Sequence, residues 1–552
     1  MSNLDTLLES TLVGDLSRRE FMARAGTLGL GAVALSQITG ALDAHAERGA
    51  SGLNTLTLNT VQVFGNIDPA IGTDYTQNMA QINFYDTLLT PTASGGLAGR
   101  LVERWSAAPD AKSFTFHLKQ GVKFHSGHEV TAADVVYSAR RILAINQGYS
   151  FVWIGYLDAG GVTALDRYTV QFSLLKPFAP FPASLAVLFI LDSATVKAHQ
   201  KSGKFGVDGD FGQGWLGSNE AGSGPYTLES NVEGSELRMK RFPGYFRGWG
   251  PGAIDEVRAL VFSAASDPTV ISLAKTGVLD MTSNYQSNTT YTTLQKLGFN
   301  IWSSPTTSVF YLKLNTRVAP TDDIHVRRAI ALAFDYETTR QQLRPGAPIG
   351  GPLSPVFKDA YNAALPVPKQ DLTAARAELA KSMYAGKGAI PLSFAYVSGA
   401  TFESQIGLLF NSIMSQIGFK VSITPQPWNR ITELATKVHD TPNVTEVFYD
   451  VLYPSPDSMF FQQYDSKSSG SWSSMEWLDD PQIDSMIARS RLTVDTAARN
   501  AIYKQLQARI AALQPDVFLL ADLWRQAVRP SVSGFTWIPA GQYQFYDLKK
   551  SS

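Results

Sequence analysis

Strand-like and helix-like segments alternate through the whole of this 552-residue chain. Residues 55–63 and 113–118 alternate apolar and polar side chains, which predicts strands, whereas residues 135–143, 402–417 and 495–513 have helical periodicity. No internal repeat is present, and no low-complexity linker divides the sequence. The pattern therefore predicts an α/β protein with interwoven lobes.

Composition excludes several classes of protein. The chain has no cysteine, so disulfides, thiolate metal sites, iron–sulfur clusters, cysteine nucleophiles and N-terminal lipoprotein anchors are all excluded. Lys and Arg number 47 against 48 Asp and Glu, and no basic run is present, which argues against a nucleic-acid partner. A hydrophobic content of 44% is enough for substantial cores.

The first 46 residues have the three parts of an export signal. Ser17-Arg18-Arg19-Glu20-Phe21-Met22 precedes an uncharged stretch over residues 25–42, and Ala44-His45-Ala46 follows it. The stretch is short and weakly apolar for a membrane-spanning helix. We interpret residues 1–46 as a twin-arginine signal that is cleaved after Ala46, which predicts a folded, periplasmic protein.

Catalytic and metal-binding patterns are absent from the sequence. It contains no G-x-S-x-G, H-E-x-x-H or G-x-x-x-x-G-K-[ST] motif. His117, His125 and His128 are close together in the sequence, but His117 lies in a predicted strand and His125 and His128 in a glycine-containing turn. We therefore interpret them as structural residues. We therefore expect no catalytic residue, no metal and no cofactor.

Aromatic residues are abundant in predicted loops. The chain has 30 Phe, 21 Tyr and 10 Trp. Loop aromatics either line a ligand cleft or anchor the loop to a lobe, and the sequence leaves both roles open. The loop aromatics are Trp153, Tyr156, Trp215, Tyr285, Trp428, Tyr449 and Tyr453.

A series of short motifs gives the chain a family resemblance. They follow one another in fixed order: Ile67-Asp68-Pro69, Leu101-Val-Glu-Arg-Trp105, Phe114-Thr-Phe-His-Leu-Lys-Gln-Gly-Val-Lys-Phe124, Thr131-Ala-Ala-Asp134, Gly224-Pro225-Tyr226, Leu273-Ala-Lys-Thr-Gly277 and Val326-Arg327-Arg328-Ala329. With this order and spacing, the chain resembles the solute-binding proteins of ABC importers in the dipeptide/oligopeptide/nickel class, family 5.

The resemblance implies a two-lobed α/β periplasmic-binding-protein fold of the large peptide-binding class. We expect lobe I, with a small N-terminal subdomain, at residues 47–287 plus 516–552, and lobe II at residues 288–515. Two strand crossings would form the hinge, and ligand would bind in the cleft and stabilise closure. The closed protein would then dock on an ABC permease in the inner membrane.

The resemblance also implies ligand contacts in three segments, at residues 74–78, 151–156 and 449–457. Dipeptide binders of the family carry an aspartate where this chain has Leu452, which argues against an ordinary free dipeptide unless Asp450 or Asp457 substitutes. The predicted ligand-binding residues are Tyr75, Asn78, Trp153, Tyr156, Trp428, Tyr449, Asp450, Tyr453 and Asp457.

Two functions remain open from the sequence. The first is the capture of a peptide or similar small organic solute by a monomeric periplasmic protein, with an opine-like compound, an oligosaccharide or a metal chelate as other ligands. The second is an exported hydrolase or cofactor-dependent enzyme, since twin-arginine export often carries such enzymes.

Overall fold

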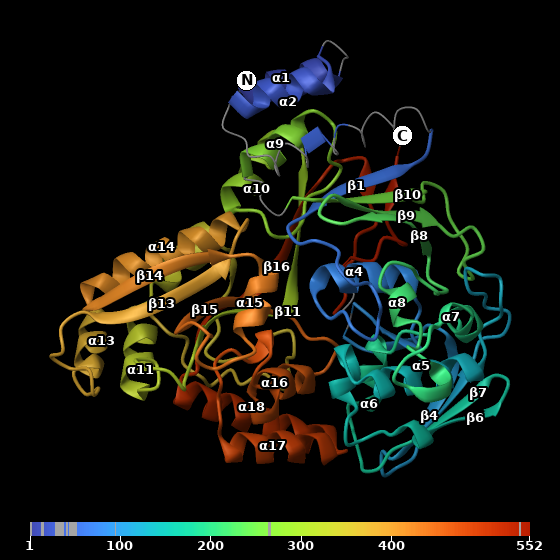
Figure 1. Ribbon diagram of the computed structural model, residues 1–552. Coiled ribbons are helices and arrows are strands. Elements are labelled where there is room, and N and C mark those ends of the chain that lie inside the picture. Colours follow the sequence, from blue (N-terminus) through green and yellow to red (C-terminus); the bar gives the residue numbers. More distant parts are fainter. Residues whose placement is uncertain are drawn as a thin grey trace.

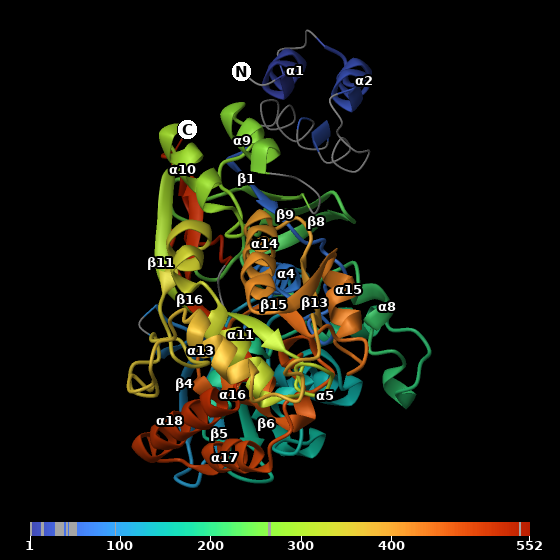
Figure 2. The same cartoon turned by 90° about the vertical axis from the view of Figure 1, so that its left-hand side faces the viewer.

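The protein has two lobes joined by a pair of long strands (Figures 1 and 2). The computed structural model describes residues 3–12, 16–27, 38–39, 42, 52–93, 95–262, 267–539 and 543–551. Both lobes combine sheets with helices, so the two-lobed α/β fold predicted from the sequence is confirmed.

Lobe I is built on two four-stranded sheets. The first has the order β1-β10-β9-β8, in which β1 and β10 are parallel and the other neighbours antiparallel. The second, with the order β4-β5-β7-β6, is antiparallel throughout. The strands are β1 (Thr55–Thr60), β8 (Tyr226–Val232), β9 (Glu236–Arg241), β10 (Glu256–Val261), β4 (Val102–Ala107), β5 (Ser113–Leu118), β6 (Val162–Asp166) and β7 (Thr169–Ser173), with a hairpin of β2 (Leu89–Pro91) and β3 (Leu97–Gly99).

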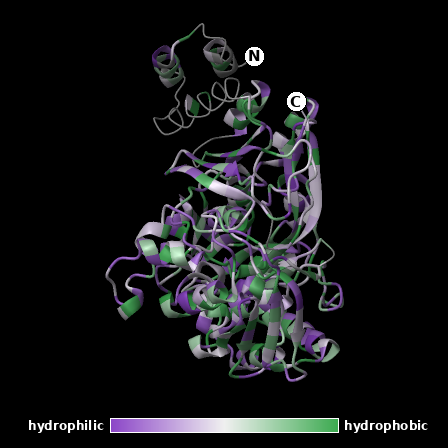
Figure 3. Cartoon of the chain, turned by 90° about the vertical axis from the view of Figure 1, so that its right-hand side faces the viewer, coloured by the Kyte–Doolittle hydropathy of each residue, from purple (hydrophilic) through white to green (hydrophobic). Residues whose placement is uncertain are grey.

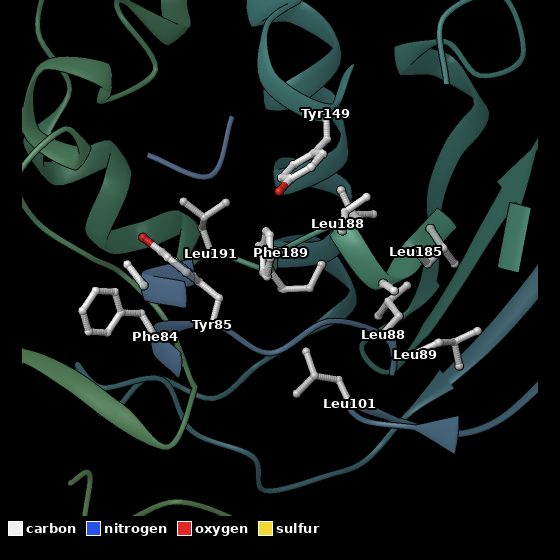
Figure 4. Packing of buried hydrophobic residues seen from close by; sticks show 14 of the residues in the cluster. Phe84, Tyr85, Leu88, Leu89, Leu101, Tyr149, Leu185, Leu188, Phe189 and Leu191 are labelled. Carbon is white, nitrogen blue, oxygen red and sulfur yellow. The ribbon is translucent and has the colours of Figure 1, made fainter. Parts of the chain in front are cut away.

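One large hydrophobic core joins these sheets to the helices of lobe I. Figure 4 shows a part of it, in which Tyr149 and Tyr85 lie on either side of Phe189. Their ring centroids are 6.3 and 6.1 Å from that of Phe189. The helices in this core are α4 (Tyr75–Phe84), α5 (Ala132–Ile145), α6 (Phe181–Ser184), α7 (Ser193–His199) and α8 (Gln213–Leu216). Two further helices, α9 (Asp267–Lys275) and α10 (Asn288–Lys296), pack in smaller clusters, and α10 lies in the range expected for lobe II.

The motif Thr131-Ala-Ala-Asp134 forms the start of helix α5. Thr131 precedes the helix, and the Asp134 carboxylate accepts hydrogen bonds from the Thr131 backbone N–H at 2.9 Å and its hydroxyl at 2.7 Å. This arrangement satisfies a donor that the first turn leaves unpaired. The motif therefore stabilises the start of the helix expected at residues 135–143, and it bears on the fold, not on the ligand.

Lobe II is built on a six-stranded mixed sheet with the order β12-β16-β11-β15-β13-β14. Its central strands β11 and β15 pair antiparallel, from Val309 opposite Tyr449 to Leu314 opposite Val444. The strands are β11 (Asn300–Leu314), β12 (Gly346–Ala347), β13 (Ile390–Val397), β14 (Phe419–Gln426), β15 (Val444–Tyr449) and β16 (Asp516–Val528).

Helices cover both faces of this sheet. Phe310 and Leu312 of β11 point to a core that includes α11, α13 and α14, whereas Val309 and Tyr311 point to a second core that includes α16, α17 and α18. Hydrophobic and hydrophilic stretches accordingly alternate along the ribbons (Figure 3). The helices are α11 (Ile324–Ala333), α12 (Tyr336–Thr338), α13 (Leu372–Leu379), α14 (Thr401–Gln416), α15 (Trp428–Leu434), α16 (Pro456–Tyr464), α17 (Pro481–Leu492) and α18 (Thr496–Leu513).

The long antiparallel pair β11 and β16 connects the lobes. Their register shifts between Pro305 and Val309, so the pair is interrupted midway along its length. Isolated bridges join Met281 to Leu58 of β1 and to Val528 of β16, which attaches the end of β16 to lobe I. Because β16 begins in the six-stranded sheet of lobe II and ends against lobe I, it is shared between the lobes, and the boundary at residue 516 stays a prediction.

The segment interpreted as an export signal contains two described helices, α1 (Asn3–Leu12) and α2 (Arg18–Thr27). Leu8 and Phe21 pack in a small cluster with Val270 and Leu273 of α9, at the upper end of the molecule in Figure 1. The cleavage site at Ala46 lies outside the described residues. Across the described residues, no helix has the length and apolar character to span a membrane.

Candidate functional site

A cavity of about 130 Å³ lies between the lobes, around the middle of β11 and β16. A cavity needs ~10–15 Å³ to hold one water molecule, so this space is large enough for more than a single water. The cavity is lined by Val61, Gln62, Thr73, Asp74, Tyr75, Asn78, Tyr149, Asn284, Tyr285, Thr306, Ser308, Val397, Ala400, Glu403, Trp428, Glu446, Val447, Phe448, Asp450, Val451, Leu452, Trp472, Asp522, Trp524 and Tyr543.

Aromatic rings from both lobes form much of this lining. Tyr75 of lobe I lies 5.2 Å from Tyr285, centroid to centroid. On the lobe II side, Trp428 contacts Trp472 edge-on at 5.2 Å. Trp524, on the shared strand β16, lies 4.8 Å from Tyr543. Such rings provide apolar area and a negative π-face for a ligand.

Carboxylates supply the formal charge of the lining, which contains five of them: Asp74, Glu403, Glu446, Asp450 and Asp522. Among the described lining residues none is Lys, Arg or His. Asp522 is bound in a bidentate pair to buried Arg344, with Nε–Oδ1 and Nη2–Oδ2 distances of 2.8 and 2.7 Å. Across the described residues, Asp74, Glu403 and Glu446 form no ion pair with a Lys, Arg or His side chain.

Asp74 and Asp450 are held by local hydrogen bonds. Asp74 caps α4, where its Oδ1 accepts from the Gln77 N–H at 3.2 Å. Asp450 Oδ1 accepts from the Thr307 hydroxyl and from the Val451 N–H. Burial raises the pKa of Asp74 to about 6 and that of Asp450 to about 7, because water is excluded from the charged form.

Glu403 and Glu446 form a pair of buried acids on the lobe II side. Glu403 Oε2 accepts from the Val397 N–H at 2.8 Å, whereas both carboxylate oxygens of Glu446 lack a hydrogen-bond partner and its side chain is only 1% exposed. Burial raises the pKa of Glu403 to about 8. Burial, followed by the charge of Glu403, raises the pKa of Glu446 well above its ordinary value.

The structure places four of the nine predicted ligand-binding residues on this cavity. They are Tyr75 and Asn78 from α4, Trp428 from the start of α15, and Asp450 directly after β15. Leu452 also lines the cavity, together with Asp450 and Val451; these residues follow the end of β15, so the alternation expected from a strand does not apply to them.

The other five predicted residues are absent from the described lining. Trp153 is buried and donates from Nε1 to Ser184 Oγ at 2.8 Å, and Tyr449 donates to the Ser458 carbonyl at 3.0 Å. Tyr156, Tyr453 and Asp457 instead surround Arg491 of α17. Tyr156 and Tyr453 thus pack against the protein itself, which is the other role that the sequence left open for loop aromatics, and Asp457 lies in the first turn of α16.

Arg491 of lobe II contacts lobe I, and Tyr156, Tyr453 and Asp457 lie around its side chain. Its Nε lies 3.0 Å from Asp457 Oδ1, and its guanidinium is 5.0 Å from the ring centroid of Tyr156 in lobe I. Tyr453 donates to Asp457 Oδ2 at 2.5 Å. The Arg491 carbonyl accepts from the Ala179 N–H of lobe I at 3.0 Å. We call Arg491, Asp457, Tyr453 and Tyr156 the arginine clasp.

Sequence reasoning missed Glu403, Glu446, Trp472 and Trp524. A signal existed for Glu446, since it interrupts the otherwise uncharged strand residues 444–449. No comparable signal marks Glu403, which lies in the first turn of α14, where an exposed acid is common.

No metal centre is found within the described ranges, where no group of three or more His, Asp or Glu is placed to hold an ion. Two of the three clustered histidines have carboxylate partners instead. His125 Nδ1 lies 2.8 Å from Glu220, and His128 Nδ1 lies 2.9 Å from Asp192.

A model of one protein family matches residues 96–471, which is more than half of the chain; its description is "Bacterial extracellular solute-binding proteins, family 5 Middle". The chain belongs to this family. The family resemblance seen in the sequence motifs is therefore confirmed.

Known proteins of similar sequence and structure cover almost the whole chain. The probable D,D-dipeptide-binding periplasmic protein DdpA of Escherichia coli (strain K12) is 27% identical over 86% of this chain and 89% of its own length. The dipeptide-binding protein from Pseudoalteromonas sp. SM9913, in complex with Met-Leu, superposes with a TM-score of 0.79 at 19% identity over 90% of this chain and 100% of that one.

A third similar structure contains a different ligand. The periplasmic binding protein AgaA of A. tumefaciens R10, in complex with agropinic acid, has a TM-score of 0.77 at 23% identity and covers 90% of this chain and 99% of its own. At these identities the structural likeness shows the shared fold alone.

Proposed function

We propose that this protein is the solute-binding component of an ABC importer and captures a peptide or a similarly small organic solute by closure of its lobes. The observation that carries the proposal is the cavity, because its lining comes from lobe I, from lobe II and from the strands that join them. A ligand there contacts both lobes only when they are closed, so it stabilises the closed state by its differential affinity.

The location and the partner follow from this role. We infer a periplasmic protein, exported by the twin-arginine route with cleavage after Ala46, that acts as a monomer and delivers ligand to an inner-membrane permease. The curated relative DdpA is described as periplasmic, which supports the compartment. The paired arginines and the Ala44-His45-Ala46 site support the route.

Binding, not catalysis, is the role that the described cavity supports. Its lining combines acidic and aromatic side chains. The described lining contains no Ser–His or Cys–His pair that could act as nucleophile and base. An exported enzyme, the other function open from the sequence, has no specific observation in its favour.

Thermal unfolding tests the proposed function. The protein without residues 1–46 is titrated with peptides, opine-like compounds, oligosaccharides and chelates. A ligand at 100 times its Kd should raise the free energy of unfolding by about 2.7 kcal/mol. Leu452→Trp fills the cavity and should remove the stabilisation. If no compound stabilises the protein, and native mass spectrometry of protein from its own periplasm finds no retained solute, solute capture is refuted.

A further inference from the structure

The charge of the cavity narrows the class of solute. Five carboxylates line it, and the guanidinium of Arg344 is already bound to Asp522 through two hydrogen bonds and to the Asn284 carbonyl at 2.7 Å. A ligand carboxylate in this cavity would therefore be desolvated with no described cation in the lining to pair with it, which is strongly unfavourable.

Glu446 points independently to a cationic ligand. Its side chain is 1% exposed, lines the cavity, and has two oxygens without a hydrogen-bond partner. Buried polar atoms are almost always paired, so a carboxylate in this state is a ready acceptor for a donor inside the cavity. Glu403, whose charge acts on Glu446, is also part of the lining.

The aromatic lining suits the same chemistry. Trp428 and Trp472 contact each other on the lobe II side, and Tyr75 and Tyr285 contact each other on the lobe I side. Aromatic faces attract ammonium groups, and most strongly where water is excluded. A metal cation is not indicated, because the described chain contains no cluster of ligands for one.

We propose that the solute is a small organic cation, an amine without a free carboxylate, whose ammonium group binds Glu446 and Glu403 among the aromatic rings of the cavity. This inference rests on the proposed function and specifies its ligand. It differs from capture of an ordinary zwitterionic dipeptide, because the carboxylate of such a peptide has no cationic partner in the described lining.

Cation binding should release protons from the cavity. The acidic groups that face it are Asp74 from the start of α4, Glu403 from α14, Glu446 and Asp450 from β15 and its end, and Asp522, which Arg344 neutralises. Its phenols are Tyr75, Tyr149, Tyr285 and Tyr543, whose pKa values burial raises further, so they stay neutral.

A cation favours the ionised acids, so its affinity should rise with pH as they lose their protons. Burial raises the pKa values of Asp74, Asp450 and Glu403 to about 6, 7 and 8, which places this rise between about pH 5.5 and 8. Above pH 8 the amine probe's own deprotonation limits the measurement.

The test compares two probes that differ only in the carboxylate. Ala-Leu and its C-terminal amide are titrated into the wild-type protein by calorimetry at pH 7.5, together with 1,5-diaminopentane and cellobiose. The amide should bind at least tenfold more tightly than Ala-Leu, and more tightly at pH 7.5 than at pH 5.5. Equal affinity for the two dipeptide forms, or no binding of either amine probe, overturns the inference.

Isosteric variants locate the contact. Glu446→Gln and Glu403→Gln should each weaken amide binding at least tenfold. Glu433→Gln, an exposed acid on α15 that pairs with Arg430, should leave it unchanged. Unaltered affinity in both cavity variants contradicts the proposal. If Ala-Leu or cellobiose stabilises the protein and the amines do not, the inference fails and solute capture stands; both fail only if the wider screen above is also negative.

Discussion

Glu446 lies in β15 opposite Leu312 of β11, in a strand whose other residues are Val444, Thr445, Val447, Phe448 and Tyr449. A carboxylic acid there is unfavourable for folding, because ionisation would leave a buried charge without a partner. Its pKa is therefore raised above the ordinary value, first by burial and then by Glu403. We interpret Glu446 as a residue that reduces stability and serves binding.

A pH series tests this cost. The unfolded chain ionises Glu446 near pH 4.5, whereas the folded protein keeps the proton to much higher pH, so wild-type stability falls as pH rises above 4.5. Glu446→Gln removes this loss. Its free energy of unfolding relative to wild type should increase between pH 5 and 8 by up to about 1.4 kcal/mol per pH unit, measured by urea unfolding without ligand.

The matched control for this series is Glu433→Gln, whose carboxylate is exposed. Its stability difference from wild type should stay within ±0.5 kcal/mol at every pH. A Glu446→Gln difference that does not change with pH would contradict the raised pKa.

The sequence predicted part of the candidate site, for reasons that differ between residues. Tyr75, Asn78, Trp428 and Asp450 lie in loops or at element ends, where family resemblance and residue type both indicate a cleft. Glu403 was not predictable, since only the packing of α14 against β13 and β14 buries it. Tyr156, Tyr453 and Asp457 also lie in segments that the family resemblance assigns to ligand contacts, but they surround Arg491, a residue of distant α17.

At the scale of elements, helices were predicted better than strand partners. The helices expected at residues 402–417 and 495–513 correspond to α14 and α18 within about one residue at each end, because local periodicity and capping determine them. The first half of strand β16 pairs inside the six-stranded sheet of lobe II, a partnership that its own residues do not indicate. Strand pairing depends on residues far apart in the chain, which periodicity does not reveal.

The arginine clasp joins α17 to lobe I and gives a prediction at this scale. Arg491→Ala should lower the free energy of unfolding by about 3–5 kcal/mol, since it leaves the buried Asp457 carboxylate without its partner. Asp457→Ala combined with Arg491→Ala should cost less than the sum of the single changes. The measurement is urea unfolding of the three variants.

The neighbouring Arg489 provides the control for the clasp. It lies on the same helix, and its guanidinium donates to the side chain of Gln505 at 3.2 Å on the exposed side. Arg489→Ala should change stability by no more than about 0.5 kcal/mol. Additive effects of the Asp457 and Arg491 changes would show that the two residues are not coupled.

For the whole molecule, β11 and β16 are the structural elements that both lobes share. Their register shift at residues 305–309 lies beside the cavity, where Thr306 and Ser308 are part of the lining. A ligand therefore contacts the connection between the lobes as well as the lobes themselves. This arrangement agrees with the two-strand hinge that the family resemblance implies.

The proposed export route gives a prediction for the whole molecule in the cell. Replacing both Arg18 and Arg19 with Lys should abolish transport and retain the full-length precursor in the cytoplasm. Arg24→Lys, outside the paired motif, should leave transport unchanged. Immunoblots of periplasmic and cytoplasmic fractions measure both, and a normal periplasmic level of the double variant would contradict the twin-arginine assignment.

Three of the ten tryptophans, Trp428, Trp472 and Trp524, line one small space and come from different elements of the chain. Indole emission responds to the polarity and to the charged groups around the ring. When a solute displaces water from between these rings, the emission colour and intensity of the unlabelled protein should change together. Intrinsic tryptophan fluorescence should therefore report whether the cavity contains a solute.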